Sequence, residues 1–182
     1  MNELKVIEIL KNELGFSDSS IKKLKKFHNY LLEYNKSYNL ISKSTEKSIW
    51  IRHILDSAQI IKLIDESKDH NIVDFGSGAG FPGLIIAFYN ENVRFHVKLY
   101  EKSPVKRAFL NNIKEKLDIK NIEIGNDVYE QKTIIADVIV CRAFKKLEEI
   151  LKISREIVKK PHKLIILKGK NAQSEINNVS LG

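Results

Sequence analysis

The sequence predicts an α/β fold, in which a mostly parallel sheet is flanked by helices and preceded by a helical extension. From residue 71 onward, short apolar runs alternate with amphipathic segments, as expected where helices connect neighbouring parallel strands. A glycine-rich turn directly follows the first of these runs. Residues 1–70 show helical periodicity alone. We therefore expect a helical extension over 1–70 that belongs to the same globule as a ligand-binding core over 71–182.

Three helices are expected in the extension. A short one starts near Leu4 and stops before Gly15, and a longer one carries apolar residues every three or four positions between Ile21 and Tyr34. A third is expected from about 45 to 64. These segments place their apolar residues on one face, so the extension should pack against the core.

The core should contain five strands and three helices. The expected strands are 72–75, 94–100, 121–124, 136–141 and 163–168. The expected helices are 81–89, 104–117 and 146–159. Ser103 and Pro104 are suited to the N-cap and the first position of the second of these helices.

The turn after the first strand carries the strongest functional signal. Asp74 is followed by four glycines within eight residues, and Pro82 stands before the last of them. Glycine accepts positive φ and lets a ligand touch the main chain, so this turn predicts a binding loop. The glycine spacing also satisfies the dinucleotide fingerprint of nicotinamide enzymes, but an acid that precedes the glycines is typical of S-adenosylmethionine methyltransferases.

Polar residues follow the other predicted strands as well. Glu101 ends the second strand, where a carboxylate can accept hydrogen bonds from ribose hydroxyls. Asp127, Arg142 and Lys168 stand at the ends of the third, fourth and fifth strands. Because the carboxyl ends of parallel strands meet at one edge, all of these residues should lie around one site.

Composition limits the classes of function. The formal net charge is +8, most of it C-terminal of residue 70, which favours a polyanionic partner. The single cysteine, Cys141, excludes an internal disulfide and a cysteine-rich metal site; no metal ligand set is expected, and a cytoplasmic location fits. No apolar run reaches about 18 residues, so no membrane partner is expected.

Several motifs together resemble one family. They include Tyr38–Ser42, Arg52–Ser57, the Asp74–Gly83 loop, Lys106–Leu110, Cys141–Phe144 and Leu167–Gly169. In this order they resemble the bacterial small-subunit ribosomal RNA methyltransferase G family, also called glucose-inhibited division protein B, over roughly residues 20–170. The resemblance implies a Rossmann-like S-adenosylmethionine methyltransferase that methylates guanine N7 in 16S ribosomal RNA, with that RNA or the small ribosomal subunit as partner.

Site residues are expected from the sequence pattern and from the resemblance together, and the resemblance itself implies cofactor contacts at Gly76, Phe81, Glu101, Val128, Tyr129 and Arg142. Those expected to contact the cofactor are Asp74, Gly76, Gly78, Gly80, Phe81, Glu101, Asp127, Val128, Tyr129 and Arg142. Those expected to contact the RNA are Asn39, Arg52, His53 and Lys168. Arg142, Asp56 and His53 are the expected catalytic residues: the arginine to orient the base or cofactor, the acid to favour positive charge on the base, and the histidine to touch the base or a phosphate.

One feature departs from the family pattern. Family members continue past the Lys-Gly segment into two further strands that complete a seven-stranded sheet, whereas this chain stops at Gly182. The C-terminal strands are therefore expected to be missing, with an exposed strand edge.

Three other functions remain open from the sequence. They are a non-catalytic RNA-binding relative, a nicotinamide-dependent oxidoreductase and a methyltransferase acting on small molecules. A nicotinamide-dependent oxidoreductase would have no function for the helical extension. The positive net charge disfavours a methyltransferase that acts on small molecules.

Overall fold

The computed structural model describes residues 2–179. A five-stranded parallel sheet forms its centre, with strand order β3-β2-β1-β4-β5. The strands are β1 (Asn71–Phe75), β2 (His96–Tyr100), β3 (Ile122–Gly125), β4 (Val138–Arg142) and β5 (Lys163–Leu167). The predicted α/β class and all five predicted strands are confirmed, with bounds shifted by one or two residues.

The order of the strands reverses between β1 and β4. The chain builds outward from β1 through β2 to β3, and then returns to place β4 on the other side of β1. Such a reversal leaves a crevice at the carboxyl ends of the strands, which is where open α/β sheets bind ligands.

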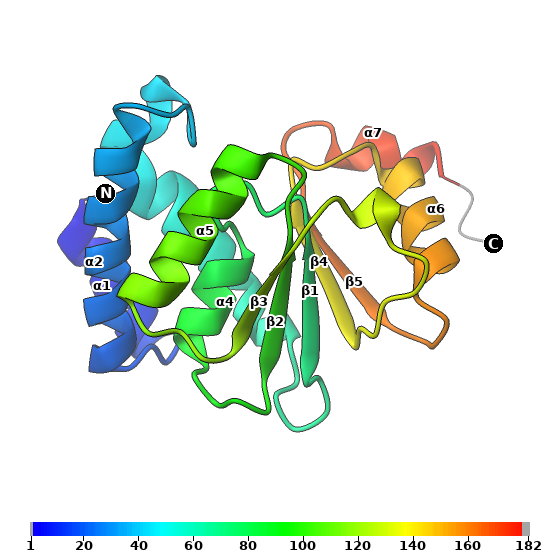
Figure 1. Cartoon of the computed structure of the whole chain (residues 1–182), viewed down its shortest axis with the longest axis horizontal. Helices are drawn as coiled ribbons and strands as arrows, with labels where there is room; N and C mark the ends of the chain where they lie inside the picture. The colour runs from blue at the N-terminus through cyan, green and yellow to red at the C-terminus, as the bar shows by residue number, and fades with distance from the viewer. Residues whose placement is uncertain (1, 180–182) are drawn as a thin grey trace.

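Helices cover both faces of the sheet (Figure 1). On one face lie α4 (Gly83–Tyr89) and α5 (Pro104–Lys116), and on the other lies α6 (Leu147–Ile157), followed by a short α7 (Ala172–Asn177). Alternate strand residues feed two hydrophobic clusters, so that Ile72 packs on the α4 and α5 side while Val73 packs on the α6 side. This two-sided burial explains why the strands have apolar runs and little polar alternation.

The N-terminal helices form an additional layer outside α4 and α5 (Figure 1). They are α1 (Glu3–Asn12) and α2 (Asp18–Asn35), and Ser17 caps α2 by accepting a hydrogen bond from the Ser20 amide. Phe27 of α2 is fully buried against Phe81, Phe88 and Phe109. The extension thus shares the core that lines one face of the sheet.

The third expected helix is not one regular α-helix. It consists of a 3₁₀ segment η1 (Lys43–Ser48), a π-helical segment η2 (Trp50–Leu55), one α turn α3 (Asp56–Ala58) and a second 3₁₀ segment η3 (Gln59–Leu63). π-Helical turns are rare and occur frequently at functional sites. This one contains two candidate site residues, Arg52 and His53.

Three further observations complete the comparison with the predicted elements. Two short elements, η4 (Val128–Glu130) and α7, have no predicted counterpart. The predicted core boundary at Gly182 lies outside the described residues. None of the helices within residues 2–179 is both long enough and apolar enough to cross a bilayer.

Candidate functional site

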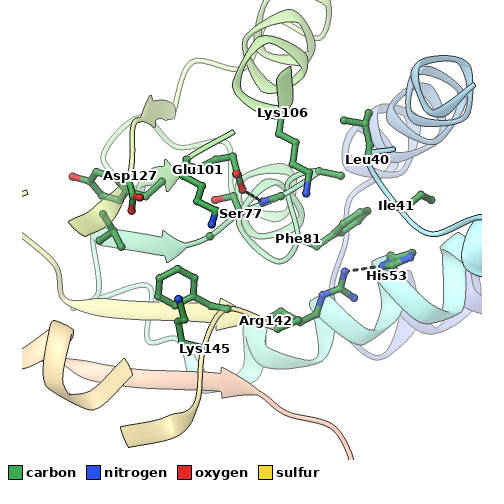
Figure 2. Close-up of a pocket in the computed structure, with 18 of the residues that line it drawn as sticks. Leu40, Ile41, His53, Ser77, Phe81, Glu101, Lys106, Asp127, Arg142 and Lys145 are labelled. Atoms are coloured by element: carbon green, nitrogen blue, oxygen red, sulfur yellow. Dashed lines mark hydrogen bonds between the residues drawn. The ribbon is translucent and has the colours of Figure 1, made fainter. Parts of the chain in front are cut away.

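A cavity of about 400 Å³ opens at the carboxyl edge of the sheet, at the reversal between β1 and β4 (Figure 2). Its floor is the glycine loop after β1, and its walls come from the segments after β2, β3 and β4. Leu40, Ile41 and His53 close it from the N-terminal extension. The extension and the core therefore build this cavity together.

The glycine loop presents main chain to the cavity. Gly76, Gly78 and Gly80 all have positive φ, at 72°, 58° and 104°. A Cβ on Gly76 would meet the Phe144 ring at 2.4 Å, whereas a Cβ on Gly78 would have no neighbour within 4 Å and would project into open space. The two glycines therefore serve different needs: close packing at Gly76, and room for a ligand at Gly78.

Asp74 lies beneath the loop and is fully buried. Its Oδ2 accepts a hydrogen bond of 2.9 Å from the Gly83 amide, and its Oδ1 has no partner among the described residues. Burial raises the pKa of Asp74 to about 7, against the opposing hydrogen bond from Gly83. The acid holds the first turn of α4 and is not among the residues that line the cavity.

Glu101 lines the cavity at the end of β2, and both of its carboxylate oxygens are held. Oε2 accepts a hydrogen bond from the Gly78 amide and Oε1 from the Ser103 amide, each at 2.8 Å. Ser103 and Pro104 begin α5 as predicted, the serine accepting a hydrogen bond from the Lys106 amide. Glu101 is 7% exposed, so its carboxylate is fixed at the cavity wall before any ligand arrives.

Arg142 ends β4 and points across the cavity toward the extension (Figure 2). Its Nη2 lies 2.7 Å from His53 Nδ1, and its Nη1 donates to the Arg52 carbonyl at 2.9 Å. Phe81 packs against both side chains: its ring stacks on His53 with centroids 5.0 Å apart, and the Arg142 guanidinium lies 5.1 Å from the centroid of the Phe81 ring. The arginine is therefore held by contacts from two distant parts of the chain.

The tautomer of His53 follows from this network. Because a guanidinium only donates, Nδ1 must accept, and the ring proton sits on Nε2. Nε2 lies 2.9 Å from Thr45 Oγ1, which itself donates to the Ser42 carbonyl. Burial, with the charges of Arg142 and Arg52, lowers the pKa of His53 to about 4. His53 is neutral at physiological pH and cannot act there as a cation toward phosphate.

Asp56 lies next to this network but outside the cavity lining. Its Oδ2 is 3.7 Å from Arg142 Nη1, and its Oδ1 accepts a hydrogen bond from Gln59. The carboxylate thus faces the arginine, and the arginine stands between the acid and the cavity.

The third wall comes from the segment after β3. Asp127, Val128 and Tyr129 all line the cavity, as the sequence predicts for a cofactor site. Asp127 caps η4 by accepting a hydrogen bond from the Tyr129 amide, while Val128 is buried. Tyr129 stacks on Phe144 with ring centroids 6.1 Å apart, so this wall combines aromatic and apolar surface with the acid Asp127.

The remaining candidate residues lie outside the cavity lining. Asn39 and Arg52 are exposed at the rim formed by the extension. Lys168 already has partners within the protein: its ammonium group donates to the Lys145 carbonyl at 2.7 Å and forms an ion pair with Glu175 at 2.8 Å. Gly80 packs against Leu84 beneath the loop. The cavity itself thus unites Gly76, Gly78, Phe81, Glu101, Arg142 and His53 with the segment 127–129.

Sequence reasoning missed several lining residues. Lys102, Lys106 and Lys145 also line the cavity, and their places just after β2 and β4 would have indicated this. Thr45, which completes the chain from Arg142 through His53, carries no recognisable signal in the sequence. It reaches His53 because the irregular winding of η1 and η2 brings residues eight apart together.

Comparison with known proteins agrees with this geometry. A family model described as rRNA small subunit methyltransferase G matches residues 20–180. Ribosomal RNA small subunit methyltransferase G of Rickettsia akari is 39% identical, covering 86% of this chain and 78% of that protein. The protein of the same name from Orientia tsutsugamushi (strain Ikeda) is 35% identical, covering 97% and 86%.

Among solved structures, a SAM-dependent O-methyltransferase of Thermotoga maritima has the same fold. The TM-score is 0.57 at 16% identity, over 82% of this chain and 52% of that one.

Proposed function

Because the chain belongs to the rRNA small subunit methyltransferase G family, we propose that it transfers a methyl group from S-adenosylmethionine to guanine N7 of 16S ribosomal RNA. The partner in this proposal is the 16S RNA, free or in the small subunit, and the compartment is the cytoplasm. The observation that supports this proposal most strongly is the cavity, which is lined by the glycine loop after β1, by the hydrogen-bonded carboxylate of Glu101 and by the hydrogen-bonded guanidinium of Arg142.

The residues present fit the cofactor. Gly78 leaves open space beside its backbone, Glu101 offers a preorganised carboxylate for ribose hydroxyls, and Val128 contributes an apolar surface for a flat base. S-Adenosylmethionine supplies an electrophilic methyl group on a sulfonium. The chain supplies the orientation of that group and the exclusion of water around it.

Guanine N7 has a free lone pair and carries no proton, so the reaction needs no general base. His53 is neutral and its Nδ1 is already engaged by Arg142, which agrees with this requirement. The rate gain must then come from alignment, for which proximity and orientation can supply roughly 7–11 kcal/mol. We assign that task to Arg142, whose planar guanidinium can face a guanine O6, a phosphate or the cofactor carboxylate.

Asp56 and His53 act in this proposal through Arg142. His53 sets the direction of the guanidinium from one side, and Asp56 adds a carboxylate 3.7 Å away. The acid also reduces the cost of moving positive charge onto the base, since it leaves the Arg142 region closer to neutrality.

Asn39 and Arg52 remain proposed RNA contacts at the rim. Lys168 has internal acceptors, so an RNA contact from it requires that these be exchanged.

The direct test is transfer of radiolabelled methyl groups from S-adenosylmethionine to 16S ribosomal RNA and to small subunits that lack the modification. Label at N7 of a guanine, located by chemical cleavage of the RNA, supports the proposal. RNA binding without label would instead identify a non-catalytic relative.

A thermal-shift comparison tests the alternative of a nicotinamide-dependent oxidoreductase independently. A ligand that binds the native state raises the unfolding temperature. We expect S-adenosylhomocysteine to raise it and NADH to leave it unchanged.

A further inference from the structure

We propose that the rim between α2 and α5 is a docking track for single-stranded RNA, on which Tyr38 stacks with a base next to the target and Lys102 and Lys106 hold the backbone phosphates. This inference rests on the proposed function, since it describes how the same cavity receives its substrate. It adds three residues to which the proposed function gives no role.

The first observation is an exposed aromatic ring beside the cavity. Tyr38 is 48% exposed, although Leu40 and Ile41, two and three positions further along the chain, line the cavity. Its ring lies 6.2 Å from that of Tyr34, at an interplanar angle of 32°, so Tyr34 supports one side. A large, half-exposed ring so near in the chain to residues of the cavity wall can serve as a stacking platform for a flat ligand.

The second observation is the register of α2 against α5. Lys116 lies over the Tyr30 ring at 4.5 Å, and Tyr34 packs edge-on against Phe109 with centroids 5.2 Å apart. The two helices therefore run antiparallel, as Figure 1 also shows. Tyr38 follows the end of α2, where its amide donates to the Tyr34 carbonyl at 2.9 Å, so the chain leaves α2 on the side of the first turn of α5, which carries Lys106.

The third observation is the charge at this rim. Lys102 and Lys106 line the cavity, and neither ammonium group has an acceptor or a carboxylate partner within residues 2–179. Figure 2 shows the Lys106 side chain extending from α5 toward the cavity. Free ammonium groups beside a ring suit a phosphate-linked chain of bases.

The charges on the opposite rim of the cavity indicate on which side the RNA backbone lies. The segment after β3 presents Asp127, and Glu130 is exposed just beyond it. Phosphates are repelled by these acids and attracted by the lysines at the start of α5. A base that enters the cavity must also be unstacked, which single-stranded or splayed-out RNA allows and a duplex does not.

The test measures RNA affinity and methyl transfer together. Binding of 16S ribosomal RNA is followed by filter binding with S-adenosylhomocysteine-loaded protein at several salt concentrations. Tyr38→Ala should weaken binding about 5- to 100-fold, while Tyr38→Phe keeps the ring and should bind about as wild type does. Lys106→Ala should reduce the slope of log K against log salt by about 0.7, and the Lys102→Ala, Lys106→Ala double variant by about twice that.

Lys114→Ala is the matched control, because Lys114 lies on the same helix two turns away and outside the cavity lining. It should leave affinity, and Tyr38 dependence, close to those of wild type. An unchanged thermal shift with S-adenosylhomocysteine shows that each variant is folded with an intact cofactor site.

The outcomes separate the two proposals. If wild-type protein methylates the RNA but the Tyr38→Ala and double-lysine variants bind it normally with unchanged salt slopes, the track is wrong and the enzyme assignment stands. If the variants lose affinity as expected but wild-type protein transfers no methyl group, the track stands and the enzyme assignment is wrong.

Discussion

Arg142 Nη2 lies 2.7 Å from His53 Nδ1, although the two residues are 89 positions apart in the chain. One belongs to the end of β4 and the other to the π-helical segment of the N-terminal extension. Their contact means that the extension determines where the arginine points inside the cavity. A change at the extension can therefore alter catalysis without touching the glycine loop.

Arg142→Lys should lower single-turnover methyl transfer about 100-fold, because one ammonium cannot reach both His53 Nδ1 and the Arg52 carbonyl while facing the cavity. The charge is kept, so a loss reports geometry. The measurement is single-turnover transfer at saturating RNA and cofactor. Activity within about twofold of wild type would contradict the assigned role.

His53→Gln should flatten the dependence of stability on pH between about 4 and 6.5. The folded-state pKa of His53 is about 4, below the ordinary value of 6.5. As pH falls from 6.5 to 4, His53 becomes protonated in the unfolded chain but stays neutral in the folded protein. The free energy of unfolding therefore decreases. Glutamine does not titrate and still offers Arg142 an acceptor.

Urea unfolding at half-unit pH steps makes this comparison, with His70→Gln as the control for an exposed histidine. Parallel curves for wild type and His53→Gln would show that His53 is not held neutral.

Asp74 should contribute the opposite slope. Its folded-state pKa is about 7, above the ordinary 3.8, so the folded protein binds a proton that the unfolded chain has lost. The free energy of unfolding should therefore decrease as pH rises from about 4 to 7. Asp74→Asn keeps an acceptor for the Gly83 amide and should remove this decrease, as seen in the same urea titration. A variant that stays as pH-dependent as wild type in this range would refute the raised pKa.

The fold and much of the cavity follow from the sequence because local chemistry fixes them. Glu101 stands after an alternating strand and before Ser103-Pro104, so its place at the carboxyl edge follows from topology alone. The same reasoning predicts that Asp74 contacts the ligand. In the structure Asp74 faces inward instead, because its carboxylate accepts a hydrogen bond from the Gly83 amide at the start of α4. Which way a side chain turns at a strand end depends on packing that periodicity does not encode.

The N-terminal contribution was harder to predict for a related reason. Helical periodicity predicts one regular helix over 45–64, whereas the segment contains 3₁₀ and π turns. That irregular winding brings Thr45 and His53 together and directs His53 at Arg142. Such contacts join segments remote in the chain, and no local pattern specifies them.

Glu101→Gln should weaken S-adenosylhomocysteine binding about 10- to 100-fold. Glutamine offers one acceptor oxygen in place of two, so it cannot accept from both the Gly78 and the Ser103 amides and still present a charged acceptor to the ribose hydroxyls, and a hydrogen bond to a charged group is worth roughly 1.5–3 kcal/mol. Isothermal titration calorimetry gives the affinity. Glu123→Gln, an exposed acid of β3 outside the cavity, is the matched control and should bind normally. Equal affinities for both variants would remove Glu101 from the cofactor site.

Gly76→Ala and Gly78→Ala should separate packing from ligand access. Both residues have positive φ, so alanine at either costs about 1–2 kcal/mol of backbone strain. At Gly76 the new methyl group also overlaps the Phe144 ring, and the unfolding midpoint should fall further. At Gly78 it meets no protein atom but fills ligand space, so S-adenosylhomocysteine should no longer stabilise the protein. Gly169→Ala, with open space and no positive φ, is the control for both measurements. A Gly78→Ala protein that binds the ligand as tightly as wild type would show that the cofactor does not lie against this loop.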